Sequence, residues 1–177
     1  AYFSSISKSW LNHSLAYFEL VRKRFSLNSN SYVIEVASND GYLLKNFVAE
    51  GIPCLGIEPT ASTAAEAEKL GVGVIREFFG SKLAQKLVAE EKSADLIIGN
   101  NVYAHVPDIN DFTKGLKTLL KSDGVVTLEF PHLLRLIEHT QFDTAYHEHF
   151  SYLSLNTVCA IFSKAGLRVW DVEELDT

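Results

Sequence analysis

The 177-residue sequence lacks several features that mark particular classes of protein. Lysine and arginine number 16 against 22 aspartate and glutamate residues, so the formal net charge is −6. An acidic chain lacks the basic surface that binds nucleic acid and is only weakly attracted to an anionic membrane. No apolar run approaches the roughly 18 residues that span a bilayer, and the start lacks the charged-then-apolar pattern of a signal peptide. We therefore expect a cytoplasmic protein that binds neither nucleic acid nor membrane.

Cysteine is scarce and methionine is absent. Cys54 and Cys159 lie in apolar segments, which favours reduced core thiols over a disulfide framework or a zinc cluster. The sequence has no initiator methionine and stops just after a strand-like run, so we interpret it as a domain excised from a larger protein. What is present, 47% hydrophobic and 21% charged residues, is typical of one globular domain with a single substantial core.

From Ser31 onward, strand-like runs alternate with helix-like runs, as in βαβ units of a parallel sheet. Candidate helix caps stand at Thr60, Ser81 and Ser154, and Gly166 closes the last predicted helix. The sequence predicts an α/β fold, a doubly wound, Rossmann-like sheet that is mostly parallel with helices on both faces. The predicted strands cover residues 32–37, 54–58, 72–75, 95–99, 125–130 and 167–172.

An amphipathic helix is predicted before the first strand, because apolar residues recur at spacings of three and four. We assign residues 1–30 to this N-terminal helical segment and residues 31–177 to the ligand-binding domain. The segment either packs as an ordinary helix across the sheet or lies over the ligand site as a lid, to which Tyr2 and Phe3 could belong. The apolar stripe consists of Trp10, Leu11, Leu15, Phe18, Val21 and Phe25.

The first predicted strand runs into a short polar loop, Ser38 to Gly41, and then into a helix. In open α/β sheets, ligands bind at the carboxyl ends of the strands, where the strand order reverses. Glu35 is the acidic exception in an otherwise apolar strand. We interpret this loop as a cofactor cradle. The alternative is an ordinary βα turn, since a lone glycine motif is weak evidence.

Glu58 ends the second predicted strand, about twenty residues after the loop, where a carboxylate can accept hydrogen bonds from both hydroxyls of an adenosine ribose. A dinucleotide fold needs three glycines in the first turn, but Ala37 and Asn39 occupy two of those places and only Gly41 remains. This disfavours a pyrophosphate. S-adenosylmethionine, an adenosine with a zwitterionic amino-acid tail, fits better than NAD, and Glu35 could order the loop or bind the ammonium of the tail. The alternative for Glu58 is a solvated strand-end glutamate.

Asn100 ends the fourth predicted strand, where it could bind the tail of the donor, while His105 faces the substrate side. A packing or capping role is the alternative for both residues. The predicted cofactor-binding residues are Glu35, Ala37, Asn39, Gly41, Glu58, Pro59, Phe79 and Asn100.

The stretch between Phe130 and Ser154 interrupts the alternation of strand-like and helix-like runs and is dense in titratable groups. At this point the sequence resembles a known family. EVASNDG, GIEP, NNVYAHV, EFPH and YHEHFSY occur in this order in S-adenosylmethionine-dependent C-methyltransferases that act on nucleotide-linked 4-keto-deoxysugars. The resemblance spans nearly the whole chain, and YHEHFSY after EFPH is its most specific part.

The resemblance implies methyl transfer to C3 of a dTDP-4-keto-6-deoxysugar, a step in building branched sugars. It makes His149 the general base, with Glu148, Tyr146 and His105 as neighbours that orient the substrate or stabilise an enolate. The chemistry agrees, because a carbon nucleophile next to a ketone requires a base for the α-proton and donors for the enolate oxygen. No metal is required.

The histidine-rich motif has two other interpretations. It could be a satisfied polar patch, or His147, Glu148 and His149 could hold a metal ion. Adjacent residues of an extended segment point to opposite faces, which disfavours convergence on one ion.

The family also implies flanking parts that this sequence does not contain, a cysteine-rich zinc-binding region before the domain and a further domain after it. We expect those parts of the parent protein to complete the nucleotide-sugar pocket, and we expect the last antiparallel strand of the usual methyltransferase sheet to be truncated. Two other functions fit the same fold: an O- or N-methyltransferase of a small metabolite, and a non-catalytic domain that binds S-adenosylmethionine.

Overall fold

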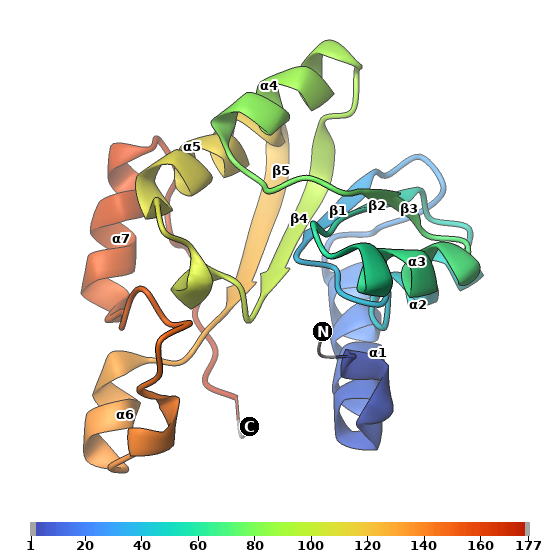
Figure 1. Ribbon diagram of the computed structural model, residues 1–177. Coiled ribbons are helices and arrows are strands. Elements are labelled where there is room, and N and C mark those ends of the chain that lie inside the picture. The colour runs from blue at the N-terminus through green and yellow to red at the C-terminus, as the bar shows by residue number, and fades with distance from the viewer. Residues whose placement is uncertain (1–2, 176–177) are drawn as a thin grey trace.

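The computed structural model describes residues 3–175 and contains a five-stranded sheet in the order β3-β2-β1-β4-β5 (Figure 1). All neighbouring strands pair in parallel. The strand order reverses between β1 and β4, so the chain winds outward in both directions and the predicted α/β doubly wound fold is confirmed. The strands are β1 (Val33–Val36), β2 (Cys54–Ile57), β3 (Gly73–Ile75), β4 (Ala94–Asn100) and β5 (Leu120–Glu129).

Helices cover both faces of the sheet and bury a separate apolar layer on each (Figure 1). The helices α1 (Lys8–Arg24), α2 (Leu44–Ala49) and α3 (Ala61–Lys69) pack on one face, with Phe18 and Phe47 in edge-to-face contact at 4.8 Å. The other face is covered by α4 (Ser81–Ala89), α5 (Ile109–Leu119) and α7 (Leu155–Lys164).

The remaining helical elements lie near the carboxyl ends of the strands. They are η1 (Ser4–Ile6), η2 (Tyr103–His105), α6 (Leu133–Glu138) and η3 (Phe142–Thr144).

The predicted N-terminal helix is confirmed as α1, but one residue of its expected apolar stripe is wrong. Phe18 and Val21 are buried, whereas Leu15 is 46% exposed and Ser14 is buried in its place. The Ser14 hydroxyl donates to the carbonyl oxygen of Leu11, so a small polar residue is satisfied by the helix itself and allows close packing. Tyr2, named with Phe3 as part of a lid, lies outside the described residues.

The predicted strand at residues 167–172 is wrong, because the segment follows α7 without regular structure. Side chains within it make tertiary contacts instead. The guanidinium of Arg24 lies 4.7 Å from the ring centre of Trp170 and pairs with Asp171 at 2.5 Å. A β-branched and aromatic run forms a strand only where a neighbouring strand offers backbone partners, and none pairs with this segment within residues 3–175.

Two of the three predicted helix caps differ from expectation. Ser154 accepts a hydrogen bond from the Thr157 amide and caps α7 as predicted. Ser81 is the first residue of α4 rather than its cap, and its amide donates to Asp111 of α5 at 3.1 Å. Thr60 is at the cap position of α3, but its side chain makes no capping bond, because the carboxylate of Glu58 accepts from the Thr60 amide instead.

The two cysteines are free thiols, as predicted, but both are half-buried rather than buried. Burial raises the pKa of the Cys54 thiol to about 11, and the nearby carboxyl group of Glu35 adds to the effect. In the part of the chain that the structure describes, none of the helices has both the length and the apolar character needed to cross a membrane.

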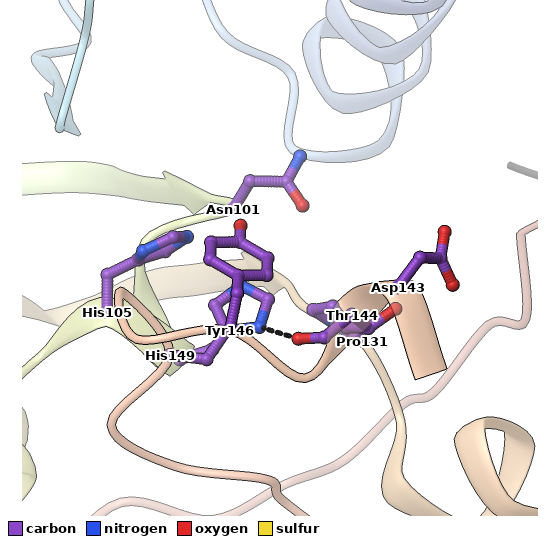
Figure 2. A pocket seen from close by; sticks show the side chains of 8 residues that line it. Asn101, His105, Pro131, Asp143, Thr144, Tyr146 and His149 are labelled. Carbon is purple, nitrogen blue, oxygen red and sulfur yellow. Dashed lines mark hydrogen bonds between the residues drawn. The ribbon is translucent and has the colours of Figure 1, made fainter. Parts of the chain in front are cut away.

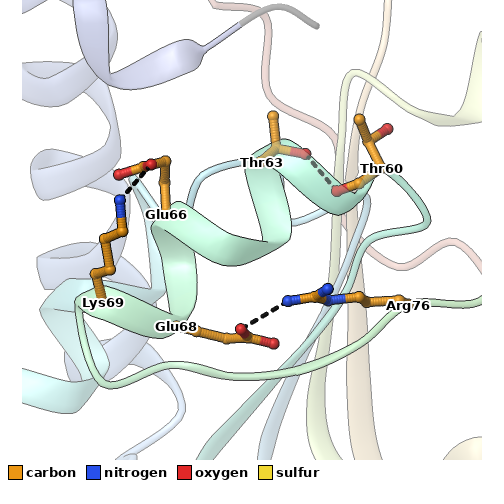
Figure 3. A network of polar contacts seen from close by, with 6 residues as sticks. All are labelled: Thr60, Thr63, Glu66, Glu68, Lys69 and Arg76. Atoms are coloured by element: carbon orange, nitrogen blue, oxygen red, sulfur yellow. Dashed lines mark hydrogen bonds and ion pairs between the residues drawn. The ribbon is translucent and has the colours of Figure 1, made fainter.

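The loop after β3 is tied to α3 by surface ion pairs (Figure 3). Arg76 pairs with Glu68 at 2.7 Å, and Lys69 pairs with Glu66 within α3 at 2.6 Å. Exposed pairs of this kind contribute only about 0–1 kcal/mol each. Their importance here is therefore in orienting the loop and not in stabilising the fold.

Two constraints together require a glycine at Gly41, and a pair of substitutions distinguishes their contributions. Its φ of +75° is unfavourable for any side chain, and an added Cβ would lie 2.9 Å from the Cβ of Ala67 in α3. Gly51 shares the positive φ (+67°) but has open space around it. We expect Gly51→Ala to lower the free energy of unfolding by about 1 kcal/mol and Gly41→Ala by about 2–4 kcal/mol, since overpacking adds to the backbone cost. Urea denaturation measures both, and equal losses would contradict the close packing of the loop before α2 against α3.

Candidate functional site

The loop between β1 and α2 keeps the backbone path of a glycine-rich turn although it has lost two glycines. Ala37 has a φ of +60°, Asn39 of +50° and Gly41 of +75°. A left-handed conformation costs roughly 1–2 kcal/mol for a residue with a side chain. Such strain is retained only where the surrounding structure enforces it, and it concentrates at ligand sites. The predicted cradle residues therefore form one specialised turn at the carboxyl end of β1.

Glu58 closes this turn from the adjacent strand. Its carboxylate accepts hydrogen bonds from the amides of Asn39, at 3.1 Å, and Thr60, at 2.8 Å, and only 6% of the residue is exposed. One oxygen is used for each bond, so each oxygen keeps a further lone pair. Glu58 is thus a buried junction between the β1 loop and α3, not a solvated strand end. Pro59 lies between the two and is half-buried.

Three buried oxygens around the loop have no hydrogen-bond partner among the described residues: Glu35 Oε2, Ser38 Oγ and Asp40 Oδ1. Burial raises the pKa of Glu35 well above its ordinary value, and the carboxylates of Asp40 and Glu58 raise it further. Buried polar atoms in native proteins almost always have partners. Unpartnered acceptors at a strained turn fit a polar, cationic ligand that brings hydrogen-bond donors.

The N-terminal η1 lies directly on this loop. The amide of Ser4 donates to Asn39 Oδ1 at 3.2 Å, and both the amide and the hydroxyl of Ser5 donate to Asp40 Oδ2, at 3.1 and 2.6 Å. Ser4 and Ser5 were not among the predicted site residues. The only signal for them was the serine-rich lead before α1.

A second part of the site is a cavity of about 310 Å³ beyond the carboxyl ends of β4 and β5 (Figure 2). It brings together three of the predicted catalytic residues, His105, Tyr146 and His149. The ring centres of His149 and Tyr146 are 4.3 Å apart, and those of His149 and His105 are 4.6 Å apart. The lining residues are Asn101, Ala104, His105, Pro131, Asp143, Thr144, Tyr146 and His149.

The histidine-rich loop is held against η2 by its backbone. The amides of Phe150 and Ser151 both donate to the carbonyl oxygen of Ala104, at 2.9 and 3.2 Å. This attachment places His149 beside His105, which lies just after β4, although the two residues are far apart in the sequence. The fourth predicted catalytic residue, Glu148, is exposed and does not line the cavity.

A single hydrogen bond sets the protonation pattern of His149. Its Nδ1 donates to the backbone carbonyl oxygen of Thr144 at 2.8 Å (Figure 2). A carbonyl oxygen can only accept, so Nδ1 carries the proton and the lone pair of the neutral ring is at Nε2. His149 is thereby prepared to take up a proton at Nε2.

His105 is held in its neutral form. Burial lowers its pKa, and the adjacent ring of His149 lowers it further. A neutral imidazole at this position can donate a hydrogen bond from one nitrogen and accept one at the other.

Other predicted residues lie elsewhere. Asn100 ends β4 opposite Glu129 but does not line the cavity, and its neighbour Asn101 does. Asn101 has a φ of +53°, and its amide donates to the carbonyl oxygen of Glu129 at 2.7 Å. The ring of Phe79 packs against Phe112 at 5.1 Å, on the core side of its loop. The Asn-Asn doublet was the signal that could have pointed to Asn101.

His132 of the EFPH motif has a structural role here. Its Nε2 accepts a hydrogen bond from the amide of Leu155, at the start of α7. Asp143 and Thr144 of η3 line the cavity but were not predicted, because nothing in the sequence distinguished them from ordinary loop residues. Across residues 3–175, no cluster of three or more histidine, cysteine or acidic side chains is arranged to hold a metal ion.

The coupling between the two histidines gives a prediction for the pKa of His105. His149→Asn removes the neighbouring titrating ring, so we expect the pKa of His105 to rise toward the ordinary 6.5 but to stay below it, since burial remains. NMR of the ring protons across a pH series measures this value. His139→Asn, at an exposed position after α6, is the matched control and should leave it unchanged. A pKa of His105 that falls in His149→Asn would contradict the arrangement.

Comparison with known proteins agrees with this geometry. A family model described as "Methyltransferase domain" matches residues 10–172. The C-methyltransferase NovU of Streptomyces niveus is 35% identical over 175 residues, which cover 99% of this chain and 42% of that protein. The chain therefore spans less than half the length of this relative.

Solved methyltransferases share the fold at low sequence identity. Magnesium protoporphyrin IX methyltransferase (ChlM) from Synechocystis PCC 6803, solved with bound SAH, superposes with a TM-score of 0.71 at 13% identity over 94% of this chain and 77% of its own. A SAM-dependent methyltransferase from Archaeoglobus fulgidus gives 0.67 at 15% identity, over 86% and 68%. With the family match over most of its length, the chain belongs to the methyltransferase-domain family.

Proposed function

We propose that this chain is the S-adenosylmethionine-dependent methyltransferase domain of an enzyme that methylates C3 of a dTDP-4-keto-6-deoxysugar through an enolate. The observation that carries the proposal is the His149–Thr144 hydrogen bond, which leaves a free imidazole lone pair beside Tyr146 and His105. The C-methyltransferase relative supports transfer to carbon. The motif order of the sequence supports the keto-sugar substrate.

The cradle residues fit the methyl donor. Glu58 is placed to accept hydrogen bonds from the ribose hydroxyls, since each of its oxygens keeps a lone pair. The unpartnered oxygens of Glu35 and Asp40 match a cationic amino-acid tail. When bound, S-adenosylmethionine supplies a methyl group on a positively charged sulfur, which needs no further activation. The η1 segment, held on Asn39 and Asp40, would cover it.

The cavity residues supply the rest of the reaction. The Nε2 atom of His149 removes the proton from C3, and the C–H electron pair becomes the enolate. The imidazolium that forms keeps its Nδ1–H bond to Thr144. The Tyr146 hydroxyl is the available donor to the enolate oxygen, and His105, whose ring is hydrogen-bonded to the backbone of Glu148, orients the substrate. Carbon then attacks the methyl group, and holding the two in line contributes much of the acceleration. Glu148 stays a prediction, because its exposed side chain does not line the cavity.

The nucleotide half of the substrate needs more than this chain provides. No lysine or arginine is among the described residues that line the cavity, and Asp143 adds a negative charge. A diphosphate is normally bound by arginine, lysine or a metal ion. Because the chain spans 42% of the relative, we propose that the flanking zinc-binding and C-terminal parts of a longer protein supply these groups.

The test of the base is deuterium exchange at C3 of the keto sugar, followed by NMR together with methyl transfer. We expect His149→Ala to slow both by a factor on the order of 10²–10⁴, the usual contribution of general base catalysis, while calorimetry shows unchanged binding of S-adenosylmethionine. His139→Ala is the matched control at an exposed histidine.

Three outcomes would contradict the proposal in different ways. Retained exchange in His149→Ala sinks the base assignment. Methylation of oxygen or nitrogen without exchange at carbon favours a small-molecule O- or N-methyltransferase. Binding of S-adenosylmethionine without any transfer, also in a chain that includes the flanking parts, favours a non-catalytic binding domain.

A further inference from the structure

One contact between a histidine and a carboxylate at the edge of the site has no part in the function described so far. His13 Nε2 of α1 lies 2.9 Å from Oε2 of Glu129, the last residue of β5. Both side chains are largely covered, with 26% and 16% exposed. The ring of Trp10 packs edge-on against His13 at 5.5 Å. Because both side chains are largely covered and an aromatic ring packs against His13, the contact has a more fixed geometry than an exposed surface pair.

The position of Glu129 puts it between the two parts of the site. Residues alternate along β5, so Glu129 lies on the same face as Thr127, whose hydroxyl meets the hydroxyl of Tyr17 from α1. Glu129 pairs with Asn100 in the β4–β5 register, and its carbonyl oxygen accepts from Asn101, which lines the cavity. The carboxylate of Glu129 therefore lies on the α1 side of the strand ends. The residue after His13, Ser14, donates to the carbonyl oxygen of Tyr42, which directly follows the β1 loop, at 3.5 Å.

Two other acidic groups share this interior. Burial raises the pKa of Tyr42 far above its ordinary range, and the charges of Glu35, Glu129, Asp40 and Tyr17 raise it further. Glu35 and Asp40 are 1% and 2% exposed, and each has one oxygen without a partner. Among the described residues, His13 is the only basic side chain paired with any of the three. The interior is therefore short of positive charge and of hydrogen-bond donors.

The proposed methyl donor, S-adenosylmethionine, carries both positive charge and N–H groups that donate hydrogen bonds. Its sulfonium is positive but has no N–H, whereas its α-ammonium is positive and has three N–H donors. The ammonium is thus the group that satisfies several carboxylate oxygens together. Burial raises the pKa of Glu35 well above its ordinary value, which disfavours its charged form. Glu129, at the edge and in contact with His13, is the better counter-charge.

We propose that Glu129 binds the α-ammonium group of the methyl donor and that His13 is a positioning residue that holds the Glu129 carboxylate in place. The inference rests on the proposed donor, S-adenosylmethionine. It gives α1 a direct part in donor binding, in addition to its packing on the sheet.

The test compares ligands with and without the amino-acid tail. Calorimetry is run with S-adenosylmethionine, with S-adenosylhomocysteine, which keeps the tail but has a neutral sulfur, and with 5′-methylthioadenosine, which has a neutral sulfur and lacks the tail. S-adenosylhomocysteine should follow S-adenosylmethionine in every variant, because both carry the ammonium. We expect Glu129→Gln to weaken S-adenosylmethionine binding by about ten-fold or more, the usual loss for a charge-assisted hydrogen bond, and to leave methylthioadenosine binding unchanged. His13→Gln should give a smaller loss with the same ligand dependence.

Three further variants and measurements keep the result interpretable. Glu129→Asp keeps the charge and should restore part of the affinity for S-adenosylmethionine. Glu19→Gln removes an exposed carboxylate from α1, the helix that contains His13, and should not change the affinity for any of the ligands. Thermal melting of each variant reports whether it is folded.

The outcomes separate this inference from the proposed reaction. A loss shared by S-adenosylmethionine and S-adenosylhomocysteine but absent for methylthioadenosine supports it, whether or not the chain catalyses C-methylation. A loss confined to S-adenosylmethionine points to the sulfonium and overturns it. Equal losses for ligands with and without the tail, or no loss for any, also overturn it while leaving the donor assignment intact. Wild-type protein that binds methylthioadenosine but not S-adenosylmethionine overturns both.

Discussion

The parallel pairing of β1 with β4 is the constraint on which the rest of the structure depends. Because Glu35 is in register with Ile98, the strained loop after β1 and the polar segment after β4 leave the sheet side by side. Strand order reverses between these two strands, so the helices that follow them go to opposite faces and leave the edge open. The donor cradle and the histidine cavity are therefore neighbours by topology, before any side chain is considered.

The chemistry then depends on attachments between parts of the chain that are far apart in sequence. The carbonyl oxygen of Ala104 receives two amides of the histidine-rich loop, and the carbonyl oxygen of Thr144 orients the His149 ring. Both are backbone acceptors, which every residue type provides. The ring of His149 and the loop that contains it are consequently held by main-chain bonds, and a further backbone bond from Glu148 holds the ring of His105.

Electrostatics divides the site into two halves. The half proposed to bind the donor is acidic, with Glu35, Asp40, Glu58 and Glu129 around the carboxyl ends of the strands and buried oxygens that have no partner among residues 3–175. The substrate half contains neutral donors and acceptors, and burial lowers the pKa of His105 so that it adds no positive charge. A cationic donor and a neutral ketone match this division. The anionic end of a sugar nucleotide does not, which is why its binding is expected to involve other parts of a longer protein.

Sequence alone determined the fold class, the alternation of strands and helices along the chain, and the cradle loop. These follow from local signals: apolar periodicity and residues that tolerate unusual backbone angles. The grouping of His105, Tyr146 and His149 was implied by the resemblance of the motifs to a known family. Only the tertiary structure decided that residues 167–172 form no strand, that Asn101 and not Asn100 lines the cavity, and that His13 meets Glu129. Each of these depends on a partner distant in the chain, whether a strand edge, a neighbouring carbonyl oxygen or a facing helix, and no local pattern encodes where that partner lies.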